Sequence, residues 1–253
     1  FGIAPAIAPM IGGLLLGFNW QAIFIFLAAY SAIAILMGST ILTETVNQSM
    51  RVPFSIVGAI SRYKTLMLNR EFILLILSVS SNFAAFFIYV LASPIFLIDH
   101  LGFTPQQFGY LFIPTVSGMM LGSLIAKKAA GVIDSKLVLK FGYYWMFTIS
   151  LANLIFCCFM PNNASINIGF IALYNIGMAS VMPIISIAAL DCFPKIRGTA
   201  ASGQAFVQML FSSVVAGIIV PILWFSTFGL SIGLFILISL GFSTIRKTRL
   251  WSV

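Results

Sequence analysis

Residues able to take part in acid–base or nucleophilic chemistry are few in this chain and lie at the ends of its apolar runs. The five carboxylates are those of Glu44, Glu71, Asp99, Asp134 and Asp191. The only histidine, His100, follows Asp99 directly, where a solvated loop residue is a simpler interpretation than a proton relay. The sequence shows no Ser/His/Asp set, no metal-ligand spacing and no phosphate-binding glycine loop. It therefore predicts a protein that is not an enzyme and that binds neither a metal nor a cofactor.

Uncharged polar and aromatic side chains inside the apolar runs are the remaining candidates for chemistry. Ser78, Asn82, Phe86 and Tyr89 are spaced by four, four and three residues, which places them on one face of a helix. Aromatic rings and Met supply contact area while amides orient a ligand, so such faces suit a cavity for amphipathic, mostly apolar molecules. Hydrogen bonds between helices, with no ligand, explain the same pattern equally well. The candidates for a substrate cavity are Asn82, Phe86, Tyr89, Tyr174, Asn175, Met178, Gln204 and Gln208.

The apolar runs that carry these residues are long enough to cross a membrane. Of the 253 residues, 61% are hydrophobic and 7% are charged, whereas soluble domains carry about 25% charged residues. A run of about 20 residues, rising ~1.5 Å per residue, crosses ~30 Å of hydrocarbon. After a partial span over 1–17, we predict seven complete spans, over 20–42, 72–98, 107–126, 141–160, 168–190, 201–222 and 228–245.

Positive charges occupy every second connection between these spans. All 13 Lys and Arg residues lie in 43–71, 127–140, 191–200 and the segment after 245, and the intervening connections hold none. Such alternation follows the positive-inside rule and predicts that the chain ends in the cytoplasm. The net charge of +8 is therefore explained by topology, and we do not expect a nucleic-acid partner.

Three further patterns concern packing rather than chemistry. In the longest connection, Phe54, Val57, Ile60, Tyr63 and Met67 recur every three or four residues, which predicts an amphipathic helix lying in the membrane interface. Glycines one turn apart, as at positions 118 and 122, allow close approach of two helices. Prolines within the spans predict bends, at Pro5, Pro9, Pro94, Pro114 and Pro183.

Several motifs along the chain resemble the Bcr/CflA drug-resistance group of the major facilitator superfamily. Residues 4–13 (APAIAPMIGG) look like the antiporter motif of the fifth helix in that family, and 20–24 (WQAIF) like the start of the sixth. The most specific stretch is the pair ALDCFP and RGTAAS at 189–194 and 197–202, which looks like the connection between the tenth and eleventh helices. Weaker matches are Glu44-Thr45 after the sixth helix, NREF at 69–72 and FGY at 108–110.

The resemblance implies a fold and a place for this chain within it. We expect an all-α polytopic membrane protein with a partial major facilitator fold, from the end of helix 5 through helix 12. Residues 1–42 would end the first six-helix bundle, 43–71 would form the cytoplasmic central loop, and 72–253 would form the second bundle with its tail. In related antiporters the acidic proton site lies in the first helix and a functional Arg in the fourth, and neither helix is present here. The resemblance further implies gating roles for Pro5, Pro9, Gly12 and Gly13.

These observations predict multidrug efflux by proton-coupled antiport, carried out by a twelve-helix protein of the bacterial inner membrane. The substrate would be a small lipophilic or amphipathic compound, the coupling ion a proton, and no cofactor is expected. Two alternatives stay open: a truncated fragment or structural membrane partner that transports nothing, and a transporter of one specific metabolite. The sequence leaves the oligomeric state undetermined.

Overall fold

The computed structural model describes residues 11–41, 55–104, 109–160 and 163–252, and within these ranges the regular secondary structure is helical throughout. Seven helices in the described part of the chain are long and apolar enough to cross a membrane, which agrees with the number of predicted spans. Their bounds are α2 Gln21–Ile41, α4 Arg70–Leu91, α5 Gly109–Ala129, α6 Ser135–Phe159, α7 Ala164–Asp191, α8 Arg197–Val214 with its continuation to Leu223, and α10 Thr227–Ile245.

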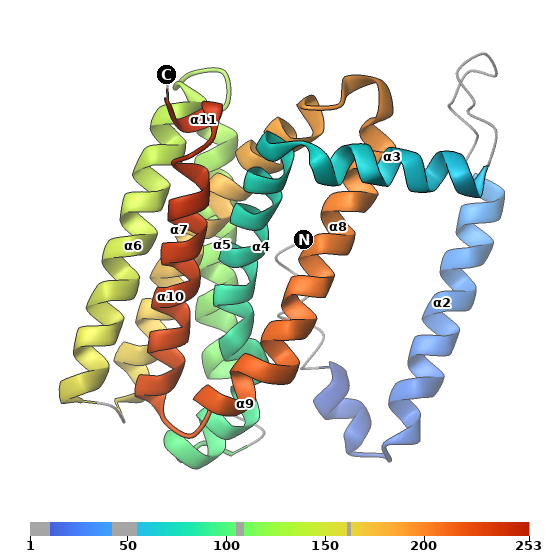
Figure 1. Ribbon diagram of the computed structural model, residues 1–253. Helices are drawn as coiled ribbons and strands as arrows, with labels where there is room; N and C mark the ends of the chain where they lie inside the picture. The colour runs from blue at the N-terminus through green and yellow to red at the C-terminus, as the bar shows by residue number, and fades with distance from the viewer. Residues whose placement is uncertain (1–10, 42–54, 105–108, 161–162, 253) are drawn as a thin grey trace.

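Six of these spans form a bundle, while α2 stands apart from it (Figure 1). Helices α4 and α7 lie within the bundle, where α4 packs against α7, α8 and α10, and α7 packs against α4, α5 and α6. None of the residues of α2 is buried. The hydrophobic core therefore belongs to the bundle from α4 to α10.

Glycines set the closest helix contact, which joins α5 to α7. A Cβ atom added at Gly118 would overlap the carbonyl oxygen of Ala172, and one added at Gly122 would overlap that of Ile176. Because only hydrogen occupies this space, the two backbones can approach each other directly. The pair of glycines one turn apart predicted this contact correctly.

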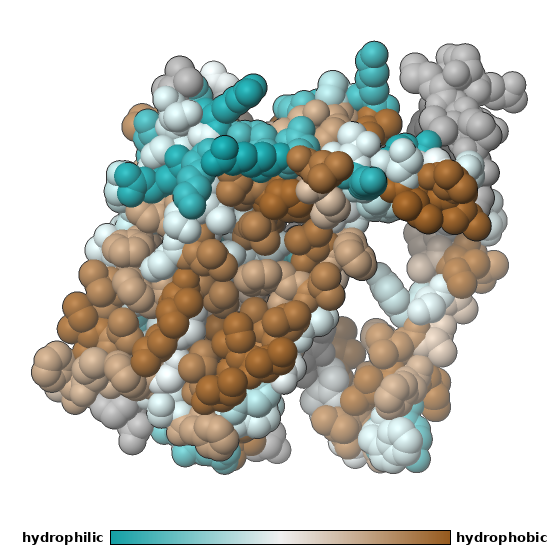
Figure 2. Space-filling view, viewed as in Figure 1, coloured by the Kyte–Doolittle hydropathy of each residue, from teal (hydrophilic) through white to brown (hydrophobic). Residues whose placement is uncertain are grey.

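The amphipathic pattern correctly predicted a helix, present as α3, Ile56–Leu68; Phe54 of that pattern lies outside the described residues. Helix α3 crosses from α2 to the bundle at the end where α11 (Arg249–Ser252) also lies (Figure 1), and its place in the membrane interface stays a prediction. Ser55 caps α3 by accepting a hydrogen bond from the backbone N–H of Gly58 at 3.2 Å. The connections from α5 to α6 and from α7 to α8 lie at this same end, and hydrophilic residues gather there (Figure 2). We call it the basic end of the bundle, because these connections, α3 and α11 carry Lys and Arg.

At the opposite end, two spans depart from α-helical geometry. After α4, residues Ile95–His100 form a π-helix directly after Pro94. After α8, residues Val215–Ile219 form another, which ends shortly before Pro221. Proline cannot donate a backbone hydrogen bond, so the regular ladder is interrupted near it. The His100 Nε2–H donates to the carbonyl oxygen of Trp224 at 2.6 Å, which ties the first π-helix to the turn that ends the α8 span. The sequence predicted a bend at Pro94 within a span over 72–98, but not the π-helical turns that follow this proline.

Candidate substrate-contact residues and the polar core

Asn82, on α4, lies at the centre of a buried hydrogen-bonded network. Its Nδ2 donates to the hydroxyl of Tyr143 on α6 at 2.7 Å, and Ser78 Oγ, one turn before Asn82, also bonds that hydroxyl. Ser78 Oγ reaches the carbonyl oxygen of Gly241 on α10 at 3.2 Å. A carbonyl can only accept, so Ser78 donates to Gly241 and Tyr143 donates to Ser78. The donors thus run in one direction and connect α4, α6 and α10.

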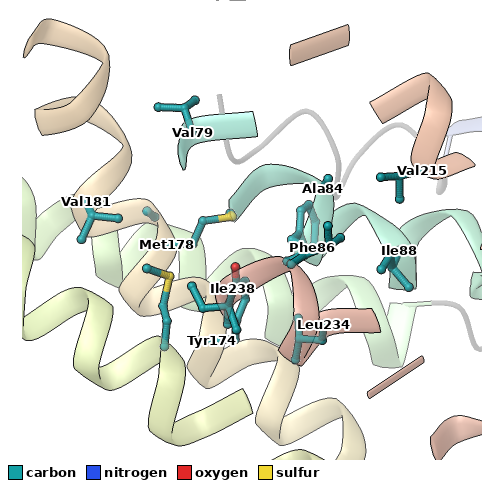
Figure 3. Close-up of a cluster of buried hydrophobic side chains, with 14 of the residues drawn as sticks. Val79, Ala84, Phe86, Ile88, Tyr174, Met178, Val181, Val215, Leu234 and Ile238 are labelled. Carbon is teal, nitrogen blue, oxygen red and sulfur yellow. The ribbon is translucent and has the colours of Figure 1, made fainter. Parts of the chain in front are cut away.

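The backbone of Asn82 brings in a fourth helix. Tyr174 on α7 donates its hydroxyl proton to the carbonyl oxygen of Asn82 at 3.0 Å. Figure 3 shows Tyr174 among Met178, Phe86 and the aliphatic side chains of Ile238 and Leu234. We call Ser78, Asn82, Tyr143, Tyr174 and Gly241 the Asn82 network. Two of the eight predicted cavity residues, Asn82 and Tyr174, belong to this network, and two more, Phe86 and Met178, lie beside Tyr174; all four are buried.

Tyr89 belongs to a separate polar cluster further along α4. Asn153 on α6 donates its Nδ2 to the Tyr89 hydroxyl at 3.0 Å. Cys157 Sγ lies 3.7 Å from Asn153 Oδ1 and 3.0 Å from Asn167 Oδ1, so its single proton faces two amide oxygens. The hydrogen bond from Asn153 to Tyr89 holds α4 and α6 together at this level.

Of the other three predicted cavity residues, Asn175 and Gln204 form hydrogen bonds between helices. Asn175 Nδ2 donates to the Thr115 carbonyl oxygen on α5 at 3.3 Å, and its own Oδ1 is buried without a hydrogen-bond partner. Gln204 Nε2, on α8, donates to Ser186 Oγ on α7 at 2.9 Å. Gln208, one turn further along α8, is half-buried. These contacts are hydrogen bonds between helices, as one of the two interpretations requires; contact of any of the eight residues with a substrate stays a prediction.

The predicted gating residues lie at the beginning of the chain. Gly12 and Gly13 fall in a helical segment, and a Cβ atom added at either would meet no described heavy atom within 4 Å. Pro5 and Pro9 lie outside the described residues. A gating role for these four residues stays a prediction.

Tyr143 is the residue that the sequence analysis missed. It stands beside Tyr144 and Trp145 near the start of a span, where aromatic residues commonly mark the membrane interface. In the structure Tyr143 is fully buried, while Tyr144 is 57% exposed. No pattern in the sequence separates these adjacent tyrosines, because only the packing of α6 against α4 and α10 decides which of them turns inward.

A pocket of about 320 Å³ lies at the basic end, between α5, α6 and α7. Its walls are largely apolar and include Ala129, Val138, Ile184, Ile187 and Leu250. Asp191 also lines it, and its carboxylate forms an ion pair with the guanidinium group of Arg197. None of the eight predicted cavity residues lines this pocket.

A model of the Major Facilitator Superfamily matches residues 1–216 of the chain. The chain belongs to this superfamily. The match covers most of the chain, and the apolar helices and their packing fit a partial major facilitator fold.

Curated relatives support the resemblance to the Bcr/CflA group. A bicyclomycin resistance protein homolog of Haemophilus influenzae is 27% identical over 228 residues, which cover 87% of this chain and 55% of that protein. An uncharacterized MFS-type transporter, YdgK, of Bacillus subtilis is 27% identical over 220 residues, covering 86% of the chain and 54% of that protein. The multidrug resistance protein MdtM of Escherichia coli O157:H7 is 28% identical over 127 residues, which cover 50% of this chain and 31% of that protein.

The chain thus spans about half the length of the first two of these relatives. Seven apolar helices and bacterial relatives of this kind indicate a multi-pass protein of the bacterial inner membrane.

Proposed function

We propose that this chain is part of a transporter that exports small lipophilic or amphipathic compounds in exchange for protons. The observation that carries the proposal is the match to the Major Facilitator Superfamily together with relatives named for bicyclomycin and multidrug resistance. The proposal places the membrane bilayer and the small-molecule substrate as the protein's partners.

The chemistry of the bundle interior supports a substrate of this kind. The described carboxylates lie at or beyond the ends of the spans, while the buried polar groups of the Asn82 network are uncharged amides and hydroxyls. A site for one specific polar metabolite normally needs charged or bidentate groups that match the substrate. Aromatic and thioether side chains beside amides, such as Phe86 and Met178 near Asn82, suit apolar molecules of varied shape.

Proton coupling requires a titratable group inside the membrane. The described spans show carboxylates only near their ends, at Glu71 and Asp191 for example. The family resemblance implies that the acidic proton site and the functional Arg lie in helices that precede those of this chain. We therefore propose that this chain supplies one wall of the substrate pathway and that the preceding helices supply the coupling.

We further propose that the basic end faces the cytoplasm. Lys and Arg flank the spans only at that end, and such residues are retained on the cytoplasmic side during membrane insertion. The helix α3 then lies in the cytoplasmic interface and connects the two halves of the transporter.

Drug accumulation in cells tests the proposal. Cells that lack their own exporters and express the full-length protein should accumulate less of a fluorescent lipophilic compound than cells with an empty vector. A protonophore should abolish that difference. Equal accumulation for a broad panel of compounds would contradict multidrug export, and a difference confined to one polar compound would favour the transporter of a specific metabolite.

A further inference from the structure

The residues that follow α10 fold back onto the basic end of the bundle instead of leaving it. We call residues 248–252 the docked segment. Thr248 is 1% exposed and donates its hydroxyl proton to the carbonyl oxygen of Ile245 at 2.6 Å. The short helix α11 follows, and Figure 1 shows it lying over the ends of α6 and α10.

Trp251 attaches the docked segment to α6 and α10. Its indole ring lies 5.4 Å from the ring of Phe242, 6.0 Å from that of Tyr144 and 6.1 Å from that of Tyr143, measured between centroids. The Lys140 Nζ lies 5.9 Å from the centre of the same ring. These are edge-on or tilted aromatic contacts and a cation–π contact, which stabilise a surface segment without burying it completely.

A second attachment is made to α4, and a third faces the pocket. The backbone N–H of Arg249 donates to Glu71 Oε1, in the first turn of α4, at 2.8 Å. Leu250 forms part of the wall of the apolar pocket beside Asp191 and Val138. Three consecutive residues of the segment therefore contact three different parts of the basic end.

The docked segment also touches the Asn82 network. The ring of Tyr143 that contacts Trp251 belongs to the same side chain whose hydroxyl holds Asn82 Nδ2. A continuous series of contacts thus runs from Trp251, at the edge of the bundle, through Tyr143 to Asn82 in the core. When the segment is in place, it covers the approach to Tyr143 from the basic end.

We propose that residues 248–252 act as a strap that undocks and redocks as a unit, and that the docked strap closes the basic end over Tyr143 and the neighbouring pocket. After the buried Thr248, its residues are exposed or half-buried and are held by side-chain and single backbone contacts, which is typical of segments that open locally while the rest of the protein stays folded. The proposal concerns this chain's own structure and does not depend on the identity of the transported compound.

Cys192 offers a natural reporter for the strap. It lies at the end of α7, half-buried, and no other described cysteine lies near the basic end. Burial raises the pKa of its thiol, the negative charges of Glu71 and Asp191 raise it further, and the positive charge of Arg249 lowers it. The thiol is therefore close enough to sense the charges of Glu71 and Arg249, the two residues whose hydrogen bond attaches the strap to α4. The proposed closure of the basic end extends to this thiol, so release of the strap should make it more accessible and more reactive despite the loss of Arg249.

The test is the rate at which a maleimide alkylates Cys192 in the full-length protein, held in lipid nanodiscs and followed by peptide mass spectrometry. Trp251→Ala should raise this rate about tenfold, because it removes the three aromatic contacts and the cation–π contact that hold the strap closed. Trp251→Phe should restore most of the protection. Ser252→Ala, an exposed change in the same helix, is the matched control and should leave the rate unchanged.

Alkylation of Cys157, which is buried between α4, α6 and α7, reports whether the variant keeps its fold. A rate at Cys192 that is unchanged in Trp251→Ala while Cys157 stays protected would overturn the proposal. If Trp251→Ala does not fold, hydrogen exchange of the unaltered protein decides. The Arg249 amide should exchange more slowly than that of Ser252 yet much faster than the amides of α10, and exchange as slow as in α10 would show that the segment does not open.

Discussion

Helices α4 and α8 are both apolar spans, yet they hold their places in different ways. In the most apolar stretch of α4, 67% of the residues are buried, against 17% in the α8 span. Helix α4 uses Ser78 and Asn82 to bond three neighbouring helices at one level. Helix α8 packs against α4 but makes its side-chain hydrogen bonds to other helices near the basic end, and it is followed by a π-helical segment.

The attachments of α8 at the basic end come from two sides. Gln204 bonds Ser186 on α7, and Ser202 Oγ lies 2.8 Å from the hydroxyl of Tyr63 on α3. A Cβ atom added at Gly203 would lie 3.1 Å from a methyl group of Leu66, so α3 and α8 are in close contact there. The difference from α4 teaches that polar bonds and glycine contacts make α4, α5, α6, α7 and α10 one unit, while the side-chain hydrogen bonds from α8 to other helices lie near the basic end.

The largest expected effect comes from forcing apart the closest helix pair of that unit. Gly118→Leu places a branched side chain against the Ala172 carbonyl, so α5 and α7 must separate. We expect a loss near the upper end of the ~1–3 kcal/mol range for overpacking, visible as a lower thermal midpoint in detergent. Gly217→Leu, in the π-helical segment after α8 where an added Cβ meets no described heavy atom within 4 Å, is the matched control. Equal losses in both variants would break the comparison between the two helices.

Removal of one hydroxyl group from the Asn82 network should have the next largest effect. Tyr143→Phe leaves Asn82 Nδ2 buried without an acceptor, which we expect to cost about 1–2 kcal/mol. Tyr144→Phe removes the same group from an exposed neighbour and should leave the thermal midpoint unchanged. Similar midpoints for the two variants would mean that the network contributes little to the stability of the bundle.

A smaller effect is expected at the attachment of α8. Gln204→Ala removes the hydrogen bond to Ser186, and because Gln204 is only half-buried the loss should be about 0.5–1 kcal/mol. Hydrogen exchange should become faster in the first turns of α8 and remain unchanged in α4. Faster exchange in α4 as well would show that the two helices open together.

The smallest predicted effect concerns how the rate of Cys192 modification, at the basic end, depends on pH. Burial disfavours the thiolate form and raises the pKa of Cys192 above its ordinary value. Little thiolate is then present near neutral pH, so maleimide should modify Cys192 more slowly than a free thiol, and the rate should keep rising with pH beyond the range where a free thiol levels off. A pH profile that matches the free thiol would show that Cys192 is not shielded.

Much of this architecture follows from patterns in the sequence. The lengths of the apolar runs predicted the spans, the three- and four-residue spacing around Ile60 predicted α3, and the Gly118 and Gly122 pair predicted the contact between α5 and α7. These features depend on local composition and on the thickness of the membrane. They can therefore be predicted without knowing which residues contact each other in the fold.

The partners of the polar side chains could not be predicted in this way. The spacing of Ser78, Asn82 and Tyr89 showed that they share a face, but the direction of that face depends on how α6 and α10 pack against α4. The π-helical turns after Pro94 and before Pro221, and the return of Trp251 onto Tyr143, likewise depend on contacts between residues distant in the sequence.

Proton movement in everted membrane vesicles is the most direct test of the proposed antiport. Vesicles that contain the full-length protein are energised until their lumen is acidic, and a lipophilic compound is then added while a pH-sensitive dye reports the lumen. The account predicts that the compound raises the luminal pH in these vesicles, as protons leave in exchange for it, and has no effect in vesicles without the protein. An unchanged luminal pH would contradict proton-coupled export. A direct measurement of the compound completes the test: the contradiction holds when the compound has entered both kinds of vesicle equally, and when it has been excluded equally from both.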